Sequence, residues 1–341
     1  SKTCKLRSKK SLPFLTLSRN YHANPAMNRR TTAYLYLLFV SLIWGAASPV
    51  VKNTLQWFDP WLFLTYRFAI STLIALPYLA LTRAKFPKKV PDQWLVLVTG
   101  VISAPLSLFL FFEALNKTTA LSGSLITAAG PLFLILGGVL FFRDRITKSE
   151  KIGISIAIIG TILTVVGPLI MNGHTDSLGK LEGNGLMLLA VFADIIAALL
   201  SKEAMKRGIA PSLIAQTQFV VGFALFLPLL FLRQTPEAAW ATLVTAPWQA
   251  HLGVAFMAVL SGTVAYSVRN IAIKSIEVSE SALFGYLQPF WAAILAVLWL
   301  REAITPSYVI GGMVITVGVI MAQQKYRKQR ALHPNRRHKR K

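Results

Sequence analysis

Long apolar runs, separated by short polar breaks or by breaks with proline and glycine, dominate the chain from Thr31 to Gln324. A helix needs about 20 mainly apolar residues to cross the hydrocarbon core of a bilayer. These runs are too long and too continuous for barrel strands, so they must be helices, which satisfy their own backbone groups in lipid. The pattern predicts an all-α integral membrane protein with ten transmembrane helices, at residues 32–52, 60–82, 93–115, 119–142, 150–170, 183–203, 211–232, 248–273, 279–300 and 305–324.

The second half of this apolar region repeats the first at a constant spacing. The stretch PLFLILGGVLFFRDRITKSEKIG, which starts at Pro131, is matched 158 positions later by PFWAAILAVLWLREAITPSYVIG from Pro289. Each half holds five expected spans, an odd number, so the second half must enter the bilayer in the opposite direction. We therefore expect two inverted five-helix repeats, at residues 31–170 and 183–324, joined by a linker at 171–182. Such repeats are typical of alternating-access transporters.

Basic residues concentrate in two tails, at residues 1–30 and 325–341. Neither tail contains Asp or Glu, and together they account for most of the formal net charge of +23. Basic segments beside a membrane domain usually mark the cytoplasmic side or contact anionic lipids, so we expect these roles and no nucleic-acid partner. Met27 is the expected natural start of the protein. The alternative interpretation of residues 1–26 is an organellar transit segment.

The composition indicates the class of protein, and the charges of the loops indicate its orientation in the membrane. Charged residues make up 14% of the chain, against about 25% in soluble domains, which excludes a soluble core. Lys and Arg prefer cytoplasmic loops, and with both tails inside they are abundant in the inner loops at 83–89, 143–151 and 202–207. The outer loops hold only Lys52, Lys117, Lys180, Arg233 and Arg301. The N- and C-termini are therefore expected in the cytoplasm.

Short segments in fixed order carry a family resemblance. They include WGAASPVVK at 44–52, TYRF at 65–68, EALNKTTALSGSLITAAGPLF at 113–133, RDRITKSEKIG at 143–153, AYSVRNIAIKSIEVSESALFGYLQPF at 265–290 and REAITPSYVIGGMVITVGVI at 301–320. Together they resemble the EamA branch of the drug/metabolite transporter superfamily over residues 31–324. The resemblance implies a ten-helix basket that carries small metabolites such as amino acids across a plasma (inner) membrane, often outward. It also implies that the first, third, fourth, sixth, eighth and ninth helices line the cavity.

The functional hypothesis is a secondary transporter, driven without ATP, that works as an exporter or a facilitator. Its closest rival is a nucleotide-sugar or sugar-phosphate exchanger of the same superfamily, and a membrane channel is a more distant one. The stretch GHTDSLGKL lacks the spacing and the hydroxyl residue of a phosphate-binding loop, which argues against ATP-driven pumping. The five histidines lie in tails, a loop or a span edge, so we expect no metal, no cofactor and no enzyme activity. Cys4 is the only cysteine and cannot form an intramolecular disulfide.

Two ionisable residues inside predicted spans are candidates for substrate binding. A charge at the centre of a membrane helix costs roughly 2.5 to 3.5 kcal/mol on insertion scales, so it needs a partner or a purpose. Asp194 lies near the middle of the sixth span, and its role cannot be taken from the family resemblance. Its carboxylate could hold an ammonium group or a coupling proton, while the Arg67 guanidinium could hold a carboxylate. The alternative is a buried structural contact between the two, or with Glu113.

Softer candidates come from aromatic, amide and proline side chains in the spans. Metabolite cavities are mostly apolar with a few placed polar groups, although packing or lipid contact is the more common role of any one such residue. Pro131 and Pro289, equivalent in the repeat, are hinge candidates or plain packing kinks. Glycines such as Gly160, Gly311 and Gly318 are expected to allow close helix contact. The remaining substrate-binding candidates are Trp44, Tyr66, Tyr266, Asn270, Tyr286, Gln288 and Trp291.

Overall fold

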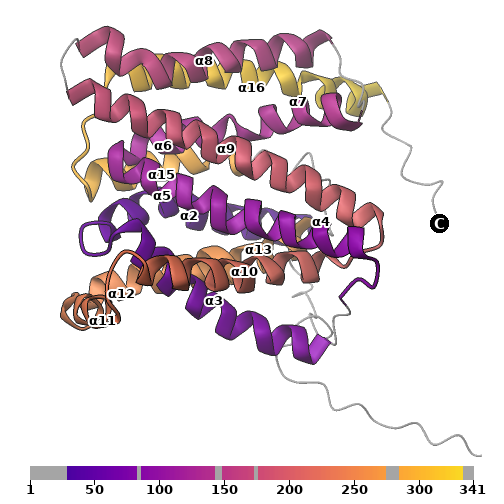
Figure 1. The fold of residues 1–341 in the computed structure, drawn as a ribbon. Helices are drawn as coiled ribbons and strands as arrows, with labels where there is room; N and C mark the ends of the chain where they lie inside the picture. Colours follow the sequence, from indigo (N-terminus) through magenta and orange to yellow (C-terminus); the bar gives the residue numbers. More distant parts are fainter. Residues whose placement is uncertain (1–28, 83–85, 143–147, 173–175, 274–283, 333–341) are drawn as a thin grey trace, which may run out of the picture.

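A computed structural model of the protein describes residues 29–82, 86–142, 148–172, 176–273 and 284–332. Within these ranges the chain forms helices joined by short turns, and it contains no β-strand. The helices lie side by side in one bundle, with α8 and α16 along one edge and α3 towards the opposite edge (Figure 1). The all-helical class predicted from the sequence is confirmed.

In the first half of the chain, one long helix changes its hydrogen-bond register. The segments α4, η1 and α5 follow one another without a break, and η1 is a π-helical stretch that contains Pro105. Proline has no backbone N–H to donate, so the regular ladder is interrupted there. The elements are α2 (Arg29–Thr54), α3 (Pro60–Thr82), α4 (Val90–Val101), η1 (Ile102–Leu106), α5 (Ser107–Lys117), α6 (Ala120–Ala128), α7 (Gly130–Phe142) and α8 (Lys148–Asn172).

The second half has a π-helical segment at the equivalent place. Adding 158 to the bounds of η1 gives 260–264, which lies inside η2. The repeat seen in the sequence therefore extends to this irregular local structure. The elements are α9 (Asp176–Lys206), α10 (Pro211–Phe231), α11 (Pro236–Thr245), α12 (Trp248–Ala255), η2 (Phe256–Val264), α13 (Ala265–Ile273), α15 (Gln288–Leu298) and α16 (Pro306–Leu332).

Among the described residues, six helical segments are long and apolar enough to cross a membrane, and a bent pair makes a possible seventh. The bent pair is Pro236–Thr245 with Trp248–Val264, at 105° to each other. Its first helix, α11, lies in a stretch that the sequence analysis left between two spans. Three further apolar helical stretches, Lys151–Thr164, Gln288–Leu298 and Tyr308–Met321, are shorter. The structure confirms a multi-pass membrane protein, whereas the count of ten spans stays a prediction.

The helices α3 and α10, which come from opposite halves, pack together along their length. The Thr72 hydroxyl donates a hydrogen bond to the Phe219 carbonyl at 3.0 Å, and the Thr65 hydroxyl donates to the Phe226 carbonyl at 3.4 Å. The residue number of the hydrogen-bond partner in α10 decreases as the residue number in α3 increases. The two helices therefore run antiparallel.

A second antiparallel pair, α8 and α16, is in contact at the level of the backbone. A Cβ atom added to Gly160 would lie 3.1 Å from the Gly311 carbonyl oxygen, and one added to Gly318 would lie 2.6 Å from that of Gly153. Only glycine tolerates such an approach, because any side chain would collide with the facing backbone. The expectation that glycines permit close helix contact is confirmed for this pair.

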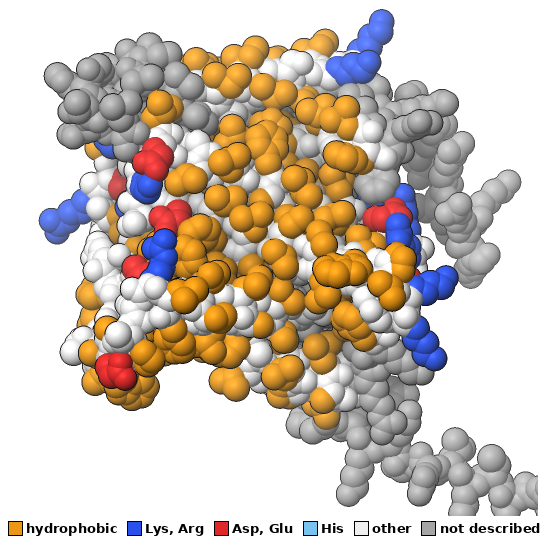
Figure 2. All heavy atoms as spheres, viewed as in Figure 1, with side chains coloured by type: hydrophobic (Ala, Val, Ile, Leu, Met, Phe, Trp, Pro, Cys, Tyr) orange, Lys and Arg blue, Asp and Glu red, His pale blue; other side chains and the backbone are white. Residues whose placement is uncertain are grey.

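Charged side chains gather at the two ends of the bundle, with a broad apolar belt between them (Figure 2). One end, here called the α11 end, carries an ion pair between Lys117 and Glu182. The other, here called the Arg207 end, carries ion pairs from Arg207 to Glu203 at 3.1 Å and to Asp92 at 3.3 Å. Hydrogen bonds to these two carboxylates raise the pKa of Arg207. An apolar belt between charged ends fits a bilayer, whose hydrocarbon core excludes charge.

Candidate functional site

Asp194 lies on the opposite side of α9 from the exposed apolar face of that helix. Leu189, Phe192 and Ile196 are 54%, 41% and 45% exposed and lie close together on one face. With 3.6 residues per turn, Asp194 projects nearly opposite to that face. Its side chain is nevertheless exposed, so it borders open space within the bundle. The acid singled out in the sequence therefore does not lie on the lipid-facing apolar surface of α9.

The neighbours of Asp194 on α9 show which helices surround it. Ala190, one turn away, accepts a hydrogen bond at 3.4 Å from the Ser107 hydroxyl of α5. Met187 packs against Gly123 of α6, where an added Cβ would lie 2.9 Å from the Met187 methyl carbon. Asp194 lies between the face that contacts α5 and the face that contacts α6. Because α5 and α6 each also contact α2, this side of α9 is directed towards α2.

Three of the softer candidates lie in α2 or against it. The Trp44 indole N–H donates to the Ser261 carbonyl of η2 at 3.1 Å. The Trp291 indole N–H donates to the Ser41 hydroxyl at 3.2 Å, which joins α15 to α2. Gln288 begins α15, and its backbone also lies against α2. The structure thus brings Trp44, Gln288 and Trp291 to the same helix, with both indole N–H groups in hydrogen bonds.

Arg67 occupies a different place from the one that a joint site with Asp194 requires. The Arg67 side chain is 5% exposed, and its guanidinium lies 5.9 Å from the centre of the Phe112 ring on α5. Phe112 and Ser107 project from different faces of α5, and it is Ser107 that contacts α9. Among the described residues no ion pair joins Arg67 to Asp194. In this conformation the two side chains do not form one binding site.

The tyrosine and asparagine candidates are scattered. The Tyr66 hydroxyl lies 3.3 Å from His251 Nδ1 on α12, so Tyr66 contributes to the contact between α3 and α12. Tyr286 packs against the apolar cluster formed by α6, α7, α8 and α16. The backbones of Tyr266 and Asn270 lie in α13, but their side chains fall outside the described residues. These residues stay predictions as substrate ligands.

The two hinge candidates each stand at the start of a helix. Pro131 is the second residue of α7, directly after the break that follows Ala128, and Pro289 is the second residue of α15. Proline is favoured in the first helical turn, where its missing N–H has no intrahelical role. The two prolines therefore begin helices, where the sequence analysis expected them to kink helices from within. A hinge role for either stays a prediction.

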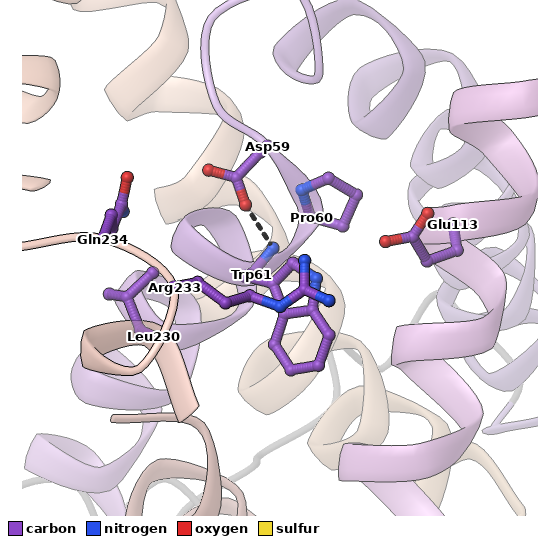
Figure 3. A pocket seen from close by; sticks show the side chains of 7 residues that line it. All are labelled: Asp59, Pro60, Trp61, Glu113, Leu230, Arg233 and Gln234. Atoms are coloured by element: carbon purple, nitrogen blue, oxygen red, sulfur yellow. Dashed lines mark hydrogen bonds between the residues drawn. The ribbon is translucent and has the colours of Figure 1, made fainter. Parts of the chain in front are cut away.

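The structure also contains a cavity that the sequence analysis did not anticipate. Figure 3 shows it at the α11 end, where three helices from distant parts of the chain meet. Its volume is about 300 Å³, and it is lined by Asp59, Pro60, Trp61, Glu113, Leu230, Arg233 and Gln234. The sequence contained one indication of this cavity, because Asp59, Glu113 and Arg233 all lie near the expected outer ends of their spans.

These features define a multi-pass helical membrane protein with an acidic side chain in its interior. The sequence matches the model of the EamA-like transporter family over residues 31–166 and 181–323. The chain belongs to this family, which confirms the resemblance found in its motifs. The two matched segments are the two halves between which the repeat was observed.

Individual relatives agree with this assignment. A protein of Bacillus subtilis named "Uncharacterized transporter YyaM" is 26% identical over 293 residues, which cover 85% of this chain and 92% of that protein. An uncharacterized transporter of Methanothermobacter thermautotrophicus is 25% identical and covers 87% of each chain. A solved crystal structure superposes with a TM-score of 0.59 at 16% identity, over 87% of this chain and 99% of the other. At that identity the likeness concerns the fold alone.

Proposed function

We propose that this protein is a secondary transporter that moves small metabolites such as amino acids by alternating access, as an exporter or a facilitator. The observation that carries the proposal is the position of Asp194, an acid on the inward side of α9 that borders open space. A carboxylate there can bind the ammonium group of an amino acid, or a proton that drives exchange. Family membership supports the transporter class, and the substrate class rests on this side chain.

The transport unit consists of ten transmembrane helices in two inverted five-helix repeats. Support comes from the equivalent helices of the two halves, because α3 with α10 and α8 with α16 run antiparallel. Gly160 and Gly318 are equivalent at the spacing of 158, and so are Gly153 and Gly311. Gly160 faces Gly311 while Gly318 faces Gly153, as expected for two repeats related by a two-fold axis in the membrane plane.

In this proposal the protein lies in the plasma membrane with the Arg207 end and both tails in the cytoplasm. The loops at 83–89, 143–151 and 202–207 support this orientation, because Lys and Arg are favoured on the cytoplasmic side. The basic tails at 1–30 and 325–341 are positioned to contact anionic lipids of the inner leaflet.

Amino acids fit the interior better than phosphorylated sugars do. An anionic substrate requires Lys or Arg at the depth of the cavity, and the strongest such candidate, Arg67, is 5% exposed and faces Phe112. The acid on α9 would repel a phosphate. Nucleotide-sugar or sugar-phosphate exchange is therefore the weaker alternative. A channel is the other alternative, and it would conduct its substrate without the saturable exchange that a counterflow assay detects.

The test is counterflow of labelled amino acids, sugars and nucleotides in proteoliposomes, with and without a pH gradient. We expect saturable flux of amino acids that Asp194→Asn abolishes and Asp194→Glu partly retains, since only the latter keeps the charge. Glu237→Gln is a matched control, because Glu237 is an exposed acid on α11. Wild-type flux of the Asp194→Asn protein at equal reconstitution would overturn the role of Asp194. Counterflow of nucleotide sugars alone would overturn the substrate class.

A further inference from the structure

The cavity at the α11 end has a rigid aromatic base. The Arg233 guanidinium carbon lies 4.3 Å from the centre of the Trp61 ring, a stacked cation–π geometry. The Trp61 ring in turn lies 4.6 Å from that of Phe109 and 5.5 Å from that of Phe226. Stacking leaves the edges of a guanidinium, which carry its N–H groups, available for other partners. Arg233 is therefore held in place while its donors remain accessible.

The two carboxylates of the cavity differ in how far they are already engaged. One oxygen of Asp59 accepts hydrogen bonds from the backbone N–H groups of Trp61 at 2.8 Å and Leu62 at 3.2 Å, at the start of α3. Neither the Glu113 carboxylate nor the Arg233 guanidinium makes a hydrogen bond or an ion pair with any described residue. Their charged groups nevertheless point towards one another across the cavity in Figure 3. A ligand that fits between them can bind both.

Gln234 adds an unused donor to the same wall. Its amide nitrogen is buried and has no hydrogen-bond partner among the described residues. Leaving a buried donor unpaired is unfavourable, so such an atom at a cavity points to a missing acceptor. Arg233 and Gln234 thus offer donors for an oxyanion, whereas Glu113 and Asp59 offer acceptors for a cation. The cavity therefore offers a partner to each of the two charges of a zwitterion.

The surface next to the cavity is apolar and exposed. Leu225 and Leu229 on α10, and Leu232 directly after it, are 38%, 40% and 82% exposed and continue one stripe of the helix surface. The stripe ends beside Arg233, which directly follows Leu232 in the sequence. A molecule with a zwitterionic head and acyl chains matches this arrangement, because its chains can lie along the stripe while its head enters the cavity.

We propose that the cavity binds the headgroup of a phospholipid that carries both a phosphate and a primary ammonium, such as phosphatidylethanolamine. Arg233 and Gln234 donate to the phosphate oxygens, and Glu113 accepts hydrogen bonds from the ammonium. Phosphatidylcholine places three methyl groups on its nitrogen and cannot donate these hydrogen bonds. Phosphatidylglycerol has no cation, so it leaves the acids of the cavity unneutralised. The site is thus selective for the ammonium headgroup.

The experiment uses the purified full-length chain in nanodiscs made of equal amounts of phosphatidylethanolamine and phosphatidylcholine. After release from the discs, native mass spectrometry measures the ratio of the two lipids that stay bound. We expect the ethanolamine lipid to dominate, and Glu113→Gln to lower the ratio about tenfold, as for one lost charge-assisted hydrogen bond. Arg233→Gln should reduce retention of both lipids. Glu237→Gln is again the control, since its acid lies outside the cavity.

Further arms keep the proposal falsifiable. Glu113→Asp should restore part of the selectivity, which separates loss of the charge from loss of folding, and elution volume checks the fold of each variant. An equal ratio of the two lipids on the wild-type protein would overturn the proposal. It would also be overturned if soluble phosphoethanolamine or a free amino acid displaced the bound lipid at comparable concentration, since the site would then serve a soluble zwitterion.

Discussion

The contacts that join α8 to α16 differ in kind from the surroundings of Asp194 on α9. At the α8 and α16 contact, glycines bring the two backbones so close that a methyl group at Gly318 would lie 2.6 Å from a carbonyl oxygen. Around Asp194 the apolar neighbours turn towards α5 and α6, and the acidic side chain itself stays exposed. The contact between α8 and α16 is tightly packed, whereas the region around Asp194 keeps open space beside the carboxyl group.

The contrast between these two regions shows how one apolar bundle can combine a fixed framework with an accessible interior. The lipid-facing surface exerts little hydrophobic force between helices, so close packing and hydrogen bonds must hold them together. That packing is concentrated where equivalent helices of the two halves meet. Substitutions there should reduce stability first, whereas substitutions at Asp194 should reduce transport first and leave stability nearly unchanged.

The largest stability effect is expected from Gly318→Leu. The new side chain would meet the Gly153 carbonyl oxygen and the Ala157 backbone nitrogen, at 2.6 and 2.7 Å from its Cβ, so the helices must separate. Overpacking of this kind costs about 1 to 3 kcal/mol, and rigid backbone on the other side favours the upper end. Thermal unfolding in detergent measures it. Gly185→Ala is the matched control in α9, where no atom lies within 4 Å, and should be neutral or slightly stabilising.

A smaller loss is expected from Glu302→Gln, which probes a polar contact between the two halves. The Glu302 carboxylate accepts from the backbone N–H groups of Ala120 at 2.8 Å and Leu121 at 3.0 Å, at the start of α6. A negative charge at a helix N-terminus stabilises the free N–H groups and the helix dipole, so its removal should cost about 1 kcal/mol. The same unfolding assay measures this.

Glu182→Gln is the comparison variant, because Glu182 pairs with Lys117 in an exposed ion pair at the same end. Exposed pairs contribute little, so this change should lower stability less than Glu302→Gln does. Equal losses of stability in the two variants would mean that the Glu302 cap on α6 contributes no more than an exposed ion pair. Contacts that join the two halves would then be no stronger than contacts on the surface.

Much of the fold could be predicted from the sequence because membrane helices are recognised by their length and apolar composition. The repeat at a spacing of 158 also relates the π-helical segments of the two halves to each other, but nothing in the sequence predicts that these segments are π-helical. The helix α11 escaped prediction because ten residues with a Pro start are too short for a span. Its 105° bend to the next helix depends on contacts that a hydropathy profile does not contain.

The site was harder to predict, for a geometric reason. An acid in the middle of an apolar run was enough to select Asp194, since lipid exposure of a charge is costly. Whether Arg67 faces α5 or the interior beside Asp194 depends on the rotation of each helix about its axis. The sequence does not determine this rotation. The cavity escaped for a related reason. Glu113 and Arg233 are far apart along the chain, and only packing brings them to one place.

The smallest effect is expected from Thr72→Val, which removes one hydrogen bond between α3 and α10. The Thr72 hydroxyl is buried and donates to the Phe219 carbonyl at 3.0 Å, and valine keeps its shape without the donor. A net loss of about 0.5 kcal/mol follows, at the lower end of the usual range for a neutral hydrogen bond, to be measured by thermal unfolding. In the control Thr82→Val, the exposed hydroxyl bonds only within its own helix, to Tyr78, so a smaller loss is expected. If both variants lose the same stability, the hydrogen bond between the halves contributes no more than a local one, and close packing alone holds α3 to α10.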